Sequence, residues 1–432
     1  MLIYLYNFVW LSVLVFAVPI LLFCRKEEIA GKLALAFPSI TLQEGNIWIH
    51  ALSVGEVISA VPLVEAIARK FPERDIVFTV TTSRGMAVAR EKLEGRVKAL
   101  LLMPLDFCWC VYRIFNYIRP SVFILVETDI WPGLPAFLKK KGIITLLVNG
   151  RVSPHTFKAY RRMSFFTRKL FEPINLCLMQ SDLDRQRLLR AGVRPEEKVI
   201  TVGNIKFDRQ WVPMNNDERS RWMNILGLQP EDLIWVAGST HSGEEEILLN
   251  AFRRLRPLFP NLRLIIAPRK IEQSEEIFKK ARLKGFKAVL KTEIKSKGST
   301  GDVFILNTMG ELDRIYGLSQ ISFVGGSLVP VGGHNLLEPA AFGCPVLFGP
   351  YMHNFALMSE LLLESGGGIQ VKNEKELYDG MSRILAHAEM RHNMSRQAKE
   401  FAEKNRGAIE EIISYITHTM TEQTAFPLQK AL

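Results

Sequence analysis

Short apolar segments alternate with amphipathic helical segments along most of this 432-residue chain. Ile47–His50 and Ile76–Thr81 have the composition of strands, and each precedes a segment with helical apolar spacing, Glu56–Lys70 and Met86–Leu93. The same pattern predicts further strands at Ala99–Met103, Val122–Val126, Ile144–Val148 and Leu176–Gln180. Strands that alternate with helices pair in parallel and are covered by helices on both faces. The sequence therefore predicts an α/β fold.

The alternation is interrupted once, between Val199–Asp208 and the polar segment Pro213–Asp217, and restarts at the apolar segment Leu233–Ala237. A chain of this length is too long for one ordinary domain. We therefore predict two Rossmann-like, doubly wound domains over residues 31–205 and 206–420, with a closing C-terminal helix in the second and a tail at 421–432. Such domains bind ligands at the carboxyl ends of their strands, so a central cleft between the domains is expected.

The N-terminal segment Leu2–Cys24 contains 23 residues and no charged side chain. As a helix it would be about 35 Å long, enough for a bilayer core. No basic residue precedes it, which disfavours a cleaved signal peptide, and Arg25, Lys26 and Lys32 follow it. The positive-inside rule then places the remaining chain on the cytoplasmic side. We expect a transmembrane anchor at residues 1–30, with a buried or interfacial helix as the alternative.

The chain is basic, with a formal net charge of +11, which favours anionic partners. One basic stretch, between Arg151 and Lys169, is interleaved with aromatic residues. Next to an anchor, this mixture fits the surface of the cytoplasmic membrane better than nucleic acid, and a solvated amphipathic helix is the alternative. We expect no nucleic-acid partner. The candidate contacts to a lipid acceptor are Arg151, Arg161 and Arg162.

The segment Phe323–Pro350 has the pattern strand, glycine loop, helix, strand. The glycines in Gly325–Ser327 and at Gly332 and Gly333 allow backbone amides to approach an anion closely. A helix N-terminus would add partial positive charge, and Glu338 could accept hydrogen bonds from a sugar diol. The segment predicts a site for a nucleotide, although glycines beside strands can also form simple tight turns.

Two carboxylates follow predicted strands of the first domain. Glu56 opens a helix after Gly55, where it can act as a general base or interact with the helix dipole. Glu127 ends an apolar strand, where a charge is costly unless it is exposed or paired. Carboxylates at neighbouring strand ends raise each other's pKa, which suits proton abstraction and also fits a structural pair.

Other polar segments have two possible functions each. The loop Gly238–Glu244 follows a strand and can hold a phosphate or cap a helix. Lys206 and Arg269 can neutralise a leaving phosphate or remain solvated. Asp182–Asp184 matches a metal-binding Asp-x-Asp pattern, but a helix start after Ser181 explains it by capping. We expect neither a metal nor a cofactor.

Seven segments together are specific to one family: HALSVGEV, VETDIWP, NGRVS, GNIKFD, GSTHSGEEE, TMGEL and FVGGSLVPVGGHNLLEPAAFG. With them, the chain resembles the 3-deoxy-D-manno-octulosonic acid (Kdo) transferases of lipopolysaccharide biosynthesis, from its N-terminus nearly to its C-terminus. The resemblance implies a GT-B fold. It also implies a metal-independent, inverting glycosyltransferase that moves Kdo from CMP-Kdo to lipid IVA, the lipid A precursor, at the inner face of the cytoplasmic membrane.

By position, the resemblance implies that Glu56 is the catalytic base and Glu127 a second carboxylate of the active site. It implies a CMP-Kdo site formed by Lys206, Ser239, Thr240, Arg269, Met309, Gly310, Glu311, Gly325, Gly326, Ser327, His334, Asn335 and Glu338. The family usually has Pro-Arg-His where this chain has Pro268-Arg269-Lys270, so that imidazole is missing here. Two alternatives remain: a GT-B transferase that uses a UDP-sugar, and a non-catalytic, membrane-bound lipid-binding protein.

Overall fold

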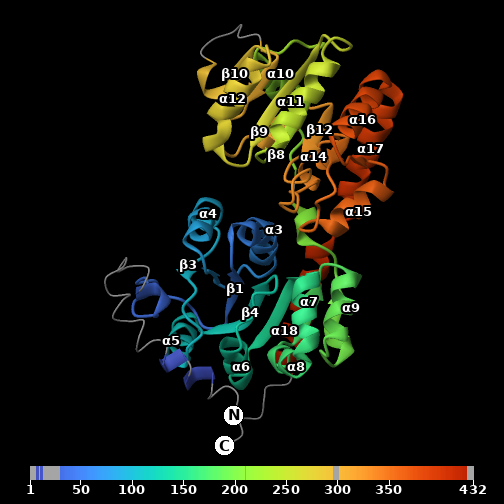
Figure 1. Ribbon diagram of the computed structural model, residues 1–432. Helices are drawn as coiled ribbons and strands as arrows, with labels where there is room; N and C mark the ends of the chain where they lie inside the picture. Colours follow the sequence, from blue (N-terminus) through green and yellow to red (C-terminus); the bar gives the residue numbers. More distant parts are fainter. Residues whose placement is uncertain (1–5, 9, 13–29, 210, 295–300, 426–432) are drawn as a thin grey trace, which may run out of the picture. The chain divides into compact units, whose positions relative to one another are not determined.

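The computed structural model describes residues 6–8, 10–12, 30–209, 211–294 and 301–425. For residues 422–425 it describes the backbone alone. The chain divides into two compact units (Figure 1). The first unit consists of Met1–Gln210 and Asn405–Leu432, and the second of Trp211–Lys404. Each unit is built on one parallel sheet, and each is considered by itself below.

The first unit has a seven-stranded sheet in the order β3-β2-β1-β4-β5-β6-β7, and its neighbouring strands are parallel. Its strands are β1 (Asn46–Ala51), β2 (Ile76–Val80), β3 (Ala99–Leu102), β4 (Pro120–Val126), β5 (Ile144–Gly150), β6 (Leu176–Met179) and β7 (Val199–Thr201). Its helices are α3 (Val54–Lys70), α4 (Ser83–Leu93), α5 (Cys108–Ile118), α6 (Gly133–Lys140), α7 (Pro154–Arg162), α8 (Ser164–Phe171), α9 (Asp182–Arg190) and α18 (Ala408–Ala425), with short 3-10 turns η1 (Glu196–Lys198) and η2 (Ile205–Asp208).

Both faces of this sheet are buried, which is why its strands are apolar without interruption. Successive side chains of a strand point to opposite faces. In β1, Ile47 and Ile49 pack with α3, α4 and α18, whereas Trp48 packs on the other face with α5 and α6. The apolar runs that predicted strands are thus explained by two hydrophobic cores, one on each face of the sheet.

The second unit has a seven-stranded sheet in the order β10-β11-β9-β8-β12-β13-β14, again with parallel neighbours. Its strands are β8 (Leu233–Thr240), β9 (Leu262–Pro268), β10 (Ala288–Leu290), β11 (Val303–Ile305), β12 (Ile321–Val324), β13 (Val346–Phe348) and β14 (Gly368–Gln370). Its helices are α10 (Asn216–Leu226), α11 (Glu244–Leu255), α12 (Ser274–Leu283), α13 (Leu312–Tyr316), α14 (Leu337–Ala341), α15 (Ala356–Glu364), α16 (Glu374–Ala386) and α17 (Ala388–Lys404), with 3-10 turns η3 (Ile271–Gln273) and η4 (Lys291–Glu293).

Each sheet has one point where the direction of strand addition reverses. In the first unit this point lies between β1 and β4, and in the second between β8 and β12. At such a point the loops after the two strands turn away from each other and leave a crevice at the carboxyl ends, where open α/β sheets bind ligands. Glu127, His241 and Gly325 lie in the loops after β4, β8 and β12, and Glu56 lies in the first turn of α3, directly after β1.

The predicted domain boundaries differ from the observed ones in two respects. The division falls after residue 210, so Lys206 belongs to the first unit and not to the second. The C-terminal helix, expected in the second domain, is α18 and packs on α3 and β5 of the first unit (red in Figure 1). The cause is apolar burial, because Ile409, Ile412 and Ile416 complete the core on that face.

Two predicted helices are broken. The basic segment Thr156–Phe171 forms α7 and α8, with Met163 between them. The helical C-terminal region divides into α17 and α18 before Ala408, where Gly407 has a φ of 110°, a value that favours glycine. Patterns of apolar spacing do not register such single-residue breaks.

The predicted membrane span Leu2–Cys24 lies outside the described residues, apart from 6–8 and 10–12. Within the part of the chain that the structure describes, no helix is both long enough and apolar enough to cross a bilayer.

Candidate active site

Glu56 is held at the carboxyl end of β1 by the turn into α3. Its carboxylate accepts hydrogen bonds from the Leu52 amide (2.5 Å) and from the Ser53 hydroxyl (3.3 Å). Only 9% of the residue is exposed. The side chain therefore folds back over the strand end, which favours a defined orientation over the solvated one of an ordinary first-turn glutamate.

Glu127 follows β4, the strand beside β1, and has a φ of 62°. This left-handed backbone is strained for a residue with a side chain, and such strain gathers at functional sites. Its carboxylate forms an ion pair with Lys206 (3.0 Å), and both side chains are partly buried. Lys206 lies in η2, where the Asn204 side chain accepts a hydrogen bond from the Lys206 amide. The structure thus brings together Glu56, Glu127 and Lys206, all from the first unit.

The surroundings of Glu56 raise its pKa to about 7. Burial is the main cause, and the negative charge of Glu127 is the next, whereas the hydrogen bonds from Leu52 and Ser53 act in the opposite direction. A carboxyl group that titrates near neutral pH can both accept and release a proton there. These properties suit a general base.

His50 lies behind these carboxylates on β1 and is almost fully buried. Its Nδ1 lies 2.9 Å from the Thr79 hydroxyl and its Nε2 4.0 Å from the Asp129 carboxylate. Asp129 in turn accepts a hydrogen bond from the Trp131 indole (3.2 Å). These contacts fix the loop after β4 against β1, and so support the position of Glu127.

In the second unit, the glycine loop after β12 surrounds the carboxylate of Glu244, the first residue of α11. The amides of Gly326, Ser327 and Leu328 donate to its two oxygens at 2.7, 2.9 and 2.9 Å. The His241 amide donates a fourth hydrogen bond at 2.9 Å. Glu244 has no exposed surface, so these donors compensate for the loss of its hydration.

The prediction that the amides near residue 326 are unpaired and receive a phosphate is therefore wrong, because a carboxylate of the protein already occupies them. The predicted contact at Ser327 is also corrected. Its side chain is buried, donating to the Val324 carbonyl and accepting from the Gly349 amide. Gly325 is needed for another reason: a Cβ there would collide with the Ser239 carbonyl on the neighbouring strand.

His334 meets His241 beside this loop. Their Nε2 atoms are 2.8 Å apart and the ring planes differ by 8°. Gly326, with a φ of 66°, allows this approach, since a Cβ there would lie 3.1 Å from the His334 ring and 3.3 Å from that of His241. Burial, followed by the charge of Arg269, lowers the pKa of His334 to about 4.

Three other predicted contacts lie at the ends of β8 and β9. Ser239 has a φ of 56°, and Thr240 is fully buried. Arg269 is exposed, and its amide donates to the Thr240 carbonyl at 3.0 Å. Its guanidinium is close enough to both histidines to lower their pKa values. Arg269 therefore lies near both histidines, and Ser239 and Thr240 directly precede His241 in the chain.

The helix predicted after the glycines is α14, which has only five residues and begins at Leu337. A helix this short contributes little dipole, so the predicted charge at its N-terminus is not a source of anion affinity. Asn335 donates to the Glu338 carboxylate at 3.4 Å, and its side-chain oxygen accepts from the Leu337 amide. The two predicted residues are therefore adjacent and hold each other in place.

Met309, Gly310 and Glu311 lie in the loop before α13. Met309 is 77% exposed, and Gly310 has a φ of 79°. Glu311 forms an ion pair with Lys291 (2.9 Å) and accepts a hydrogen bond from Thr308. This loop follows β11, which is two strands away from β8 in the sheet.

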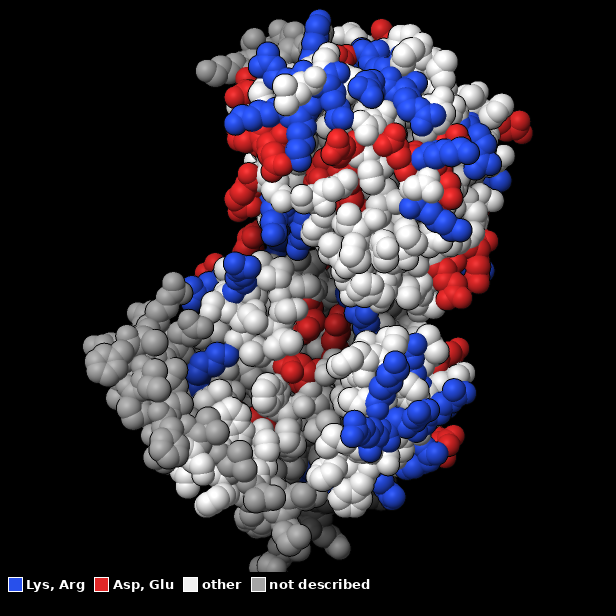
Figure 2. Space-filling view, in the orientation of Figure 1, with Lys and Arg blue, Asp and Glu red and all other residues white. Residues whose placement is uncertain are grey.

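The three predicted acceptor contacts are not in one place. The Arg151 amide donates to the Thr128 hydroxyl at 2.9 Å, so this residue adjoins the Glu127 loop. Arg161 and Arg162 end α7 and are exposed, with the Arg161 guanidinium 5.7 Å from the centre of the Phe157 ring. Figure 2 shows basic side chains gathered over α7, α8 and α9 of the first unit. Met163, Phe165 and Phe166 are at least half exposed beside them.

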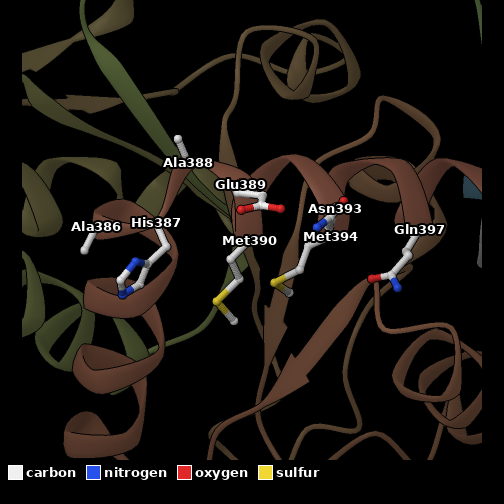
Figure 3. A pocket seen from close by; sticks show the side chains of 8 residues that line it. All are labelled: Ala386, His387, Ala388, Glu389, Met390, Asn393, Met394 and Gln397. Atoms are coloured by element: carbon white, nitrogen blue, oxygen red, sulfur yellow. The ribbon is translucent and has the colours of Figure 1, made fainter.

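A shallow pocket of about 590 Å³ lies elsewhere, where α16 meets α17 (Figure 3). Its lining, from Ala386 to Gln397, includes none of the predicted site residues. The Asp182–Asp184 pattern is used internally: Ser181 caps α9, Asp184 accepts from the Val152 amide, and Asp182 accepts from the Thr201 hydroxyl. Capping therefore explains this pattern, as the sequence indicated.

Sequence reasoning missed the roles of Glu244 and His241. Glu244 is the first of three consecutive glutamates at a helix start, and nothing in their order shows which one turns inward. His241 lies in the loop Gly238–Glu244, for which the sequence predicted phosphate binding or helix capping but no role for the imidazole. A histidine that faces a second histidine 93 residues later leaves no signal in the local pattern.

Comparison with known proteins identifies the family of this chain. Residues 27–209 match the profile of the family "3-Deoxy-D-manno-octulosonic-acid transferase (kdotransferase)", and residues 228–401 match "Glycosyl transferases group 1". The chain is 33% identical over 374 residues to a 3-deoxy-D-manno-octulosonic acid transferase of Haemophilus influenzae, covering 86% of each chain. The chain belongs to the Kdo transferase family. It is therefore a glycosyltransferase.

A second relative, the 3-deoxy-D-manno-octulosonic acid transferase of Aquifex aeolicus, is 32% identical over 81% of this chain and 89% of its own. Among solved structures, UDP-GlcNAc 2-epimerase from Neisseria meningitidis covers 86% of this chain and 100% of its own, with a TM-score of 0.61 and 11% identity. At that identity the likeness concerns the fold alone. Together with the two parallel sheets, it confirms the predicted GT-B-like α/β fold.

Replacing Glu244 with Gln should destabilise the second unit. An amide nitrogen cannot accept the hydrogen bonds that one carboxylate oxygen now accepts, and buried donors left without partners cost about 3 kcal/mol or more in total. Hydrogen exchange measured by mass spectrometry should show faster exchange at Gly326–Leu328. The control is Glu246→Gln on the same helix turn, which is exposed and should change unfolding by less than about 0.5 kcal/mol. Unchanged protection in Glu244→Gln would contradict the role given to this carboxylate.

Proposed function

We propose that this glycosyltransferase moves Kdo from CMP-Kdo to lipid IVA with inversion at the anomeric carbon, in lipopolysaccharide core biosynthesis and without a metal ion. The observation that carries the proposal is Glu56, a buried carboxylate with a pKa of about 7 beside a second carboxylate at the strand-order reversal of the first sheet. Membership of the Kdo transferase family supplies the substrate class.

On the acceptor side, Glu56 removes the proton from the attacking hydroxyl of the lipid-linked sugar. A base with a pKa near the operating pH is ionised in much of the population and still basic enough to take a proton. Glu127 sustains this pKa by its charge and is itself held by Lys206. The hydroxyl oxygen attacks the anomeric carbon from the face opposite the nucleotide, which inverts the configuration.

The second unit holds the donor. We assign the donor to the side chains of Arg269, His334, Asn335 and Glu338, which follow β9 and β12 and are exposed or partly exposed. The carboxylate of Glu338 can accept hydrogen bonds from the ribose hydroxyls, and exposed Arg269 offsets charge on the leaving phosphate. Catalysis requires donor and acceptor to meet in line, which two domains achieve by closing around their substrates.

The enzyme acts at the cytoplasmic face of the inner membrane, with a single N-terminal anchor. The charge-free segment Leu2–Cys24 and the basic residues after it support this placement. Arg161 and Arg162, with the exposed aromatic residues of α8, suit a surface of anionic lipid and bring the active site to a membrane-embedded acceptor.

Alkaline carbonate extraction of membranes tests the anchor. Full-length protein should stay in the membrane pellet, because carbonate removes proteins held by charge but not a spanning helix. A variant that begins at residue 31 is the control and should be released. Release of the full-length chain into the supernatant would contradict the anchor.

Mass spectrometry of lipid IVA incubated with the enzyme and a CMP-Kdo supply tests the reaction itself. The wild-type enzyme should add the mass of at least one Kdo. Glu56→Gln should bind CMP almost normally and lose roughly a hundredfold or more in turnover, the usual size of a general-base effect. Glu91→Gln, an exposed glutamate on α4, is the control and should be unaffected. Near-normal turnover in Glu56→Gln would remove that residue from the role of base.

The pH dependence of kcat/KM should depend on Glu127. Because the base must be ionised, activity should fall as the pH drops below about 7, the pKa of Glu56. The charge of Glu127 raises that pKa, so Glu127→Gln should lower it and move the acidic limb of the profile to lower pH. A limb that stays in place or moves to higher pH would show that the two carboxylates are not coupled in this way.

A further inference from the structure

The hydrogen bond between His241 and His334 determines where protons can lie in this pair. At 2.8 Å, one Nε2 must carry a proton and donate it, and the other must accept. When the pair is neutral each ring has one N–H group, so the donating ring has no proton on its Nδ1. No hydrogen bond to either Nδ1 is found within the described part of the chain. That Nδ1 is therefore the atom that accepts an additional proton.

Burial and the neighbouring cations favour the neutral form of the pair. Burial, then Arg269, then His241 lower the pKa of His334 to about 4. The pKa of His241 is lowered by burial and by Arg269 and Lys270, against the opposing charge of Glu244. The carboxylate of Glu244 accepts hydrogen bonds from the loop amides, whereas the side chains of Arg269 and Lys270 are exposed. An anion that binds beside Arg269 and Lys270 offsets their positive charge and so raises the pKa of the rings.

The position of the histidine pair, beside the glycine loop, also favours binding of an anion. Both rings lie against Gly326, in the loop that the sequence singled out for phosphate binding. Because Glu244 occupies the amides of that loop, a phosphate needs other donors in this crevice. The imidazole pair and the Arg269 guanidinium, whose charge affects the pKa of both rings, are candidate donors.

We propose that His241, His334 and Arg269 hold the phosphodiester of the nucleotide-sugar donor, and that the histidine pair takes up a proton from solvent when this group binds. The proposal rests on the proposed CMP-Kdo donor and specifies how its phosphate is held. His353, on the loop after β13, faces Gly332 rather than the pair and has no part in it.

The additional proton has a use in the reaction. As the bond between the anomeric carbon and the phosphate oxygen breaks, its electron pair stays on that oxygen, which gains negative charge. A protonated ring donates a charge-assisted hydrogen bond to it, and the guanidinium of Arg269 adds a second cation. The proton stays on the ring until the nucleotide leaves and then returns to solvent.

Titration calorimetry of the full-length protein with cytidine 5′-(methyl phosphate) tests this proposal. This phosphodiester does not titrate near neutral pH, so any proton exchanged belongs to the protein. Comparing buffers of different ionisation enthalpy at pH values between about 5 and 6 should give a net proton uptake on binding, as expected when a pKa of about 4 rises toward its ordinary value. The affinity of the wild-type protein should rise as the pH falls from about 8 to 6, by at most tenfold per unit.

Variants assign the proton to the pair. The double variant His241→Asn/His334→Asn should bind the phosphodiester more weakly and without proton uptake. His387→Asn changes an exposed histidine of the same unit and should behave as the wild type. Should the double variant fail to fold, the pH dependence of the wild-type affinity decides alone, since a flat profile overturns the proposal.

The anion and the donor are tested separately. Free Kdo carries a carboxylate and no phosphate, so proton uptake with Kdo but not with the phosphodiester would assign the histidines to the sugar acid and overturn the proposal. Binding of the phosphodiester without uptake would also overturn it and leave the proposed function intact. Binding of UDP but not of the cytidine compound would instead contradict the proposed function.

Discussion

The carboxylate of Glu244, buried among four backbone amides, is the interaction on which the loop structure of the second unit depends. It joins the first turn of α11 to the loop after β12, and so ties together the two loops that flank the strand-order reversal of the second sheet. Its negative charge fills the site that a glycine loop offers to a ligand. The loop is thereby shaped in advance, and the ligand's phosphate must be bound by side chains around it.

The first unit uses the same location in a different way. There the loops after β1 and β4 bring two carboxylates close together, and one cation, Lys206, is paired with Glu127. Glu56 is left with two hydrogen bonds and a raised pKa. The same place in two similar sheets therefore holds a carboxylate of raised pKa in one unit and a pair of histidines beside Arg269 in the other. The proposed roles of proton acceptor and anion-binding group follow from this difference.

The sequence predicted the α/β fold, most strands and the positions of Glu56 and Glu127, because short uninterrupted apolar runs and residues just after strands follow local rules. It did not predict that Glu244 enters the glycine loop or that His241 meets His334, since both contacts join loops more than 80 residues apart. The C-terminal helix was assigned to the wrong unit for a similar reason. Its apolar face shows that it packs on a core but not on which one.

A crystal structure with bound CMP would show directly which groups hold the phosphate. We expect the phosphate beside the rings of His241 and His334 and near Arg269, while the Glu244 carboxylate keeps its hydrogen bonds to Gly326, Ser327 and Leu328. A phosphate bound to those three amides, with Glu244 displaced from them, would show that the glycine loop and not the histidine pair binds the nucleotide.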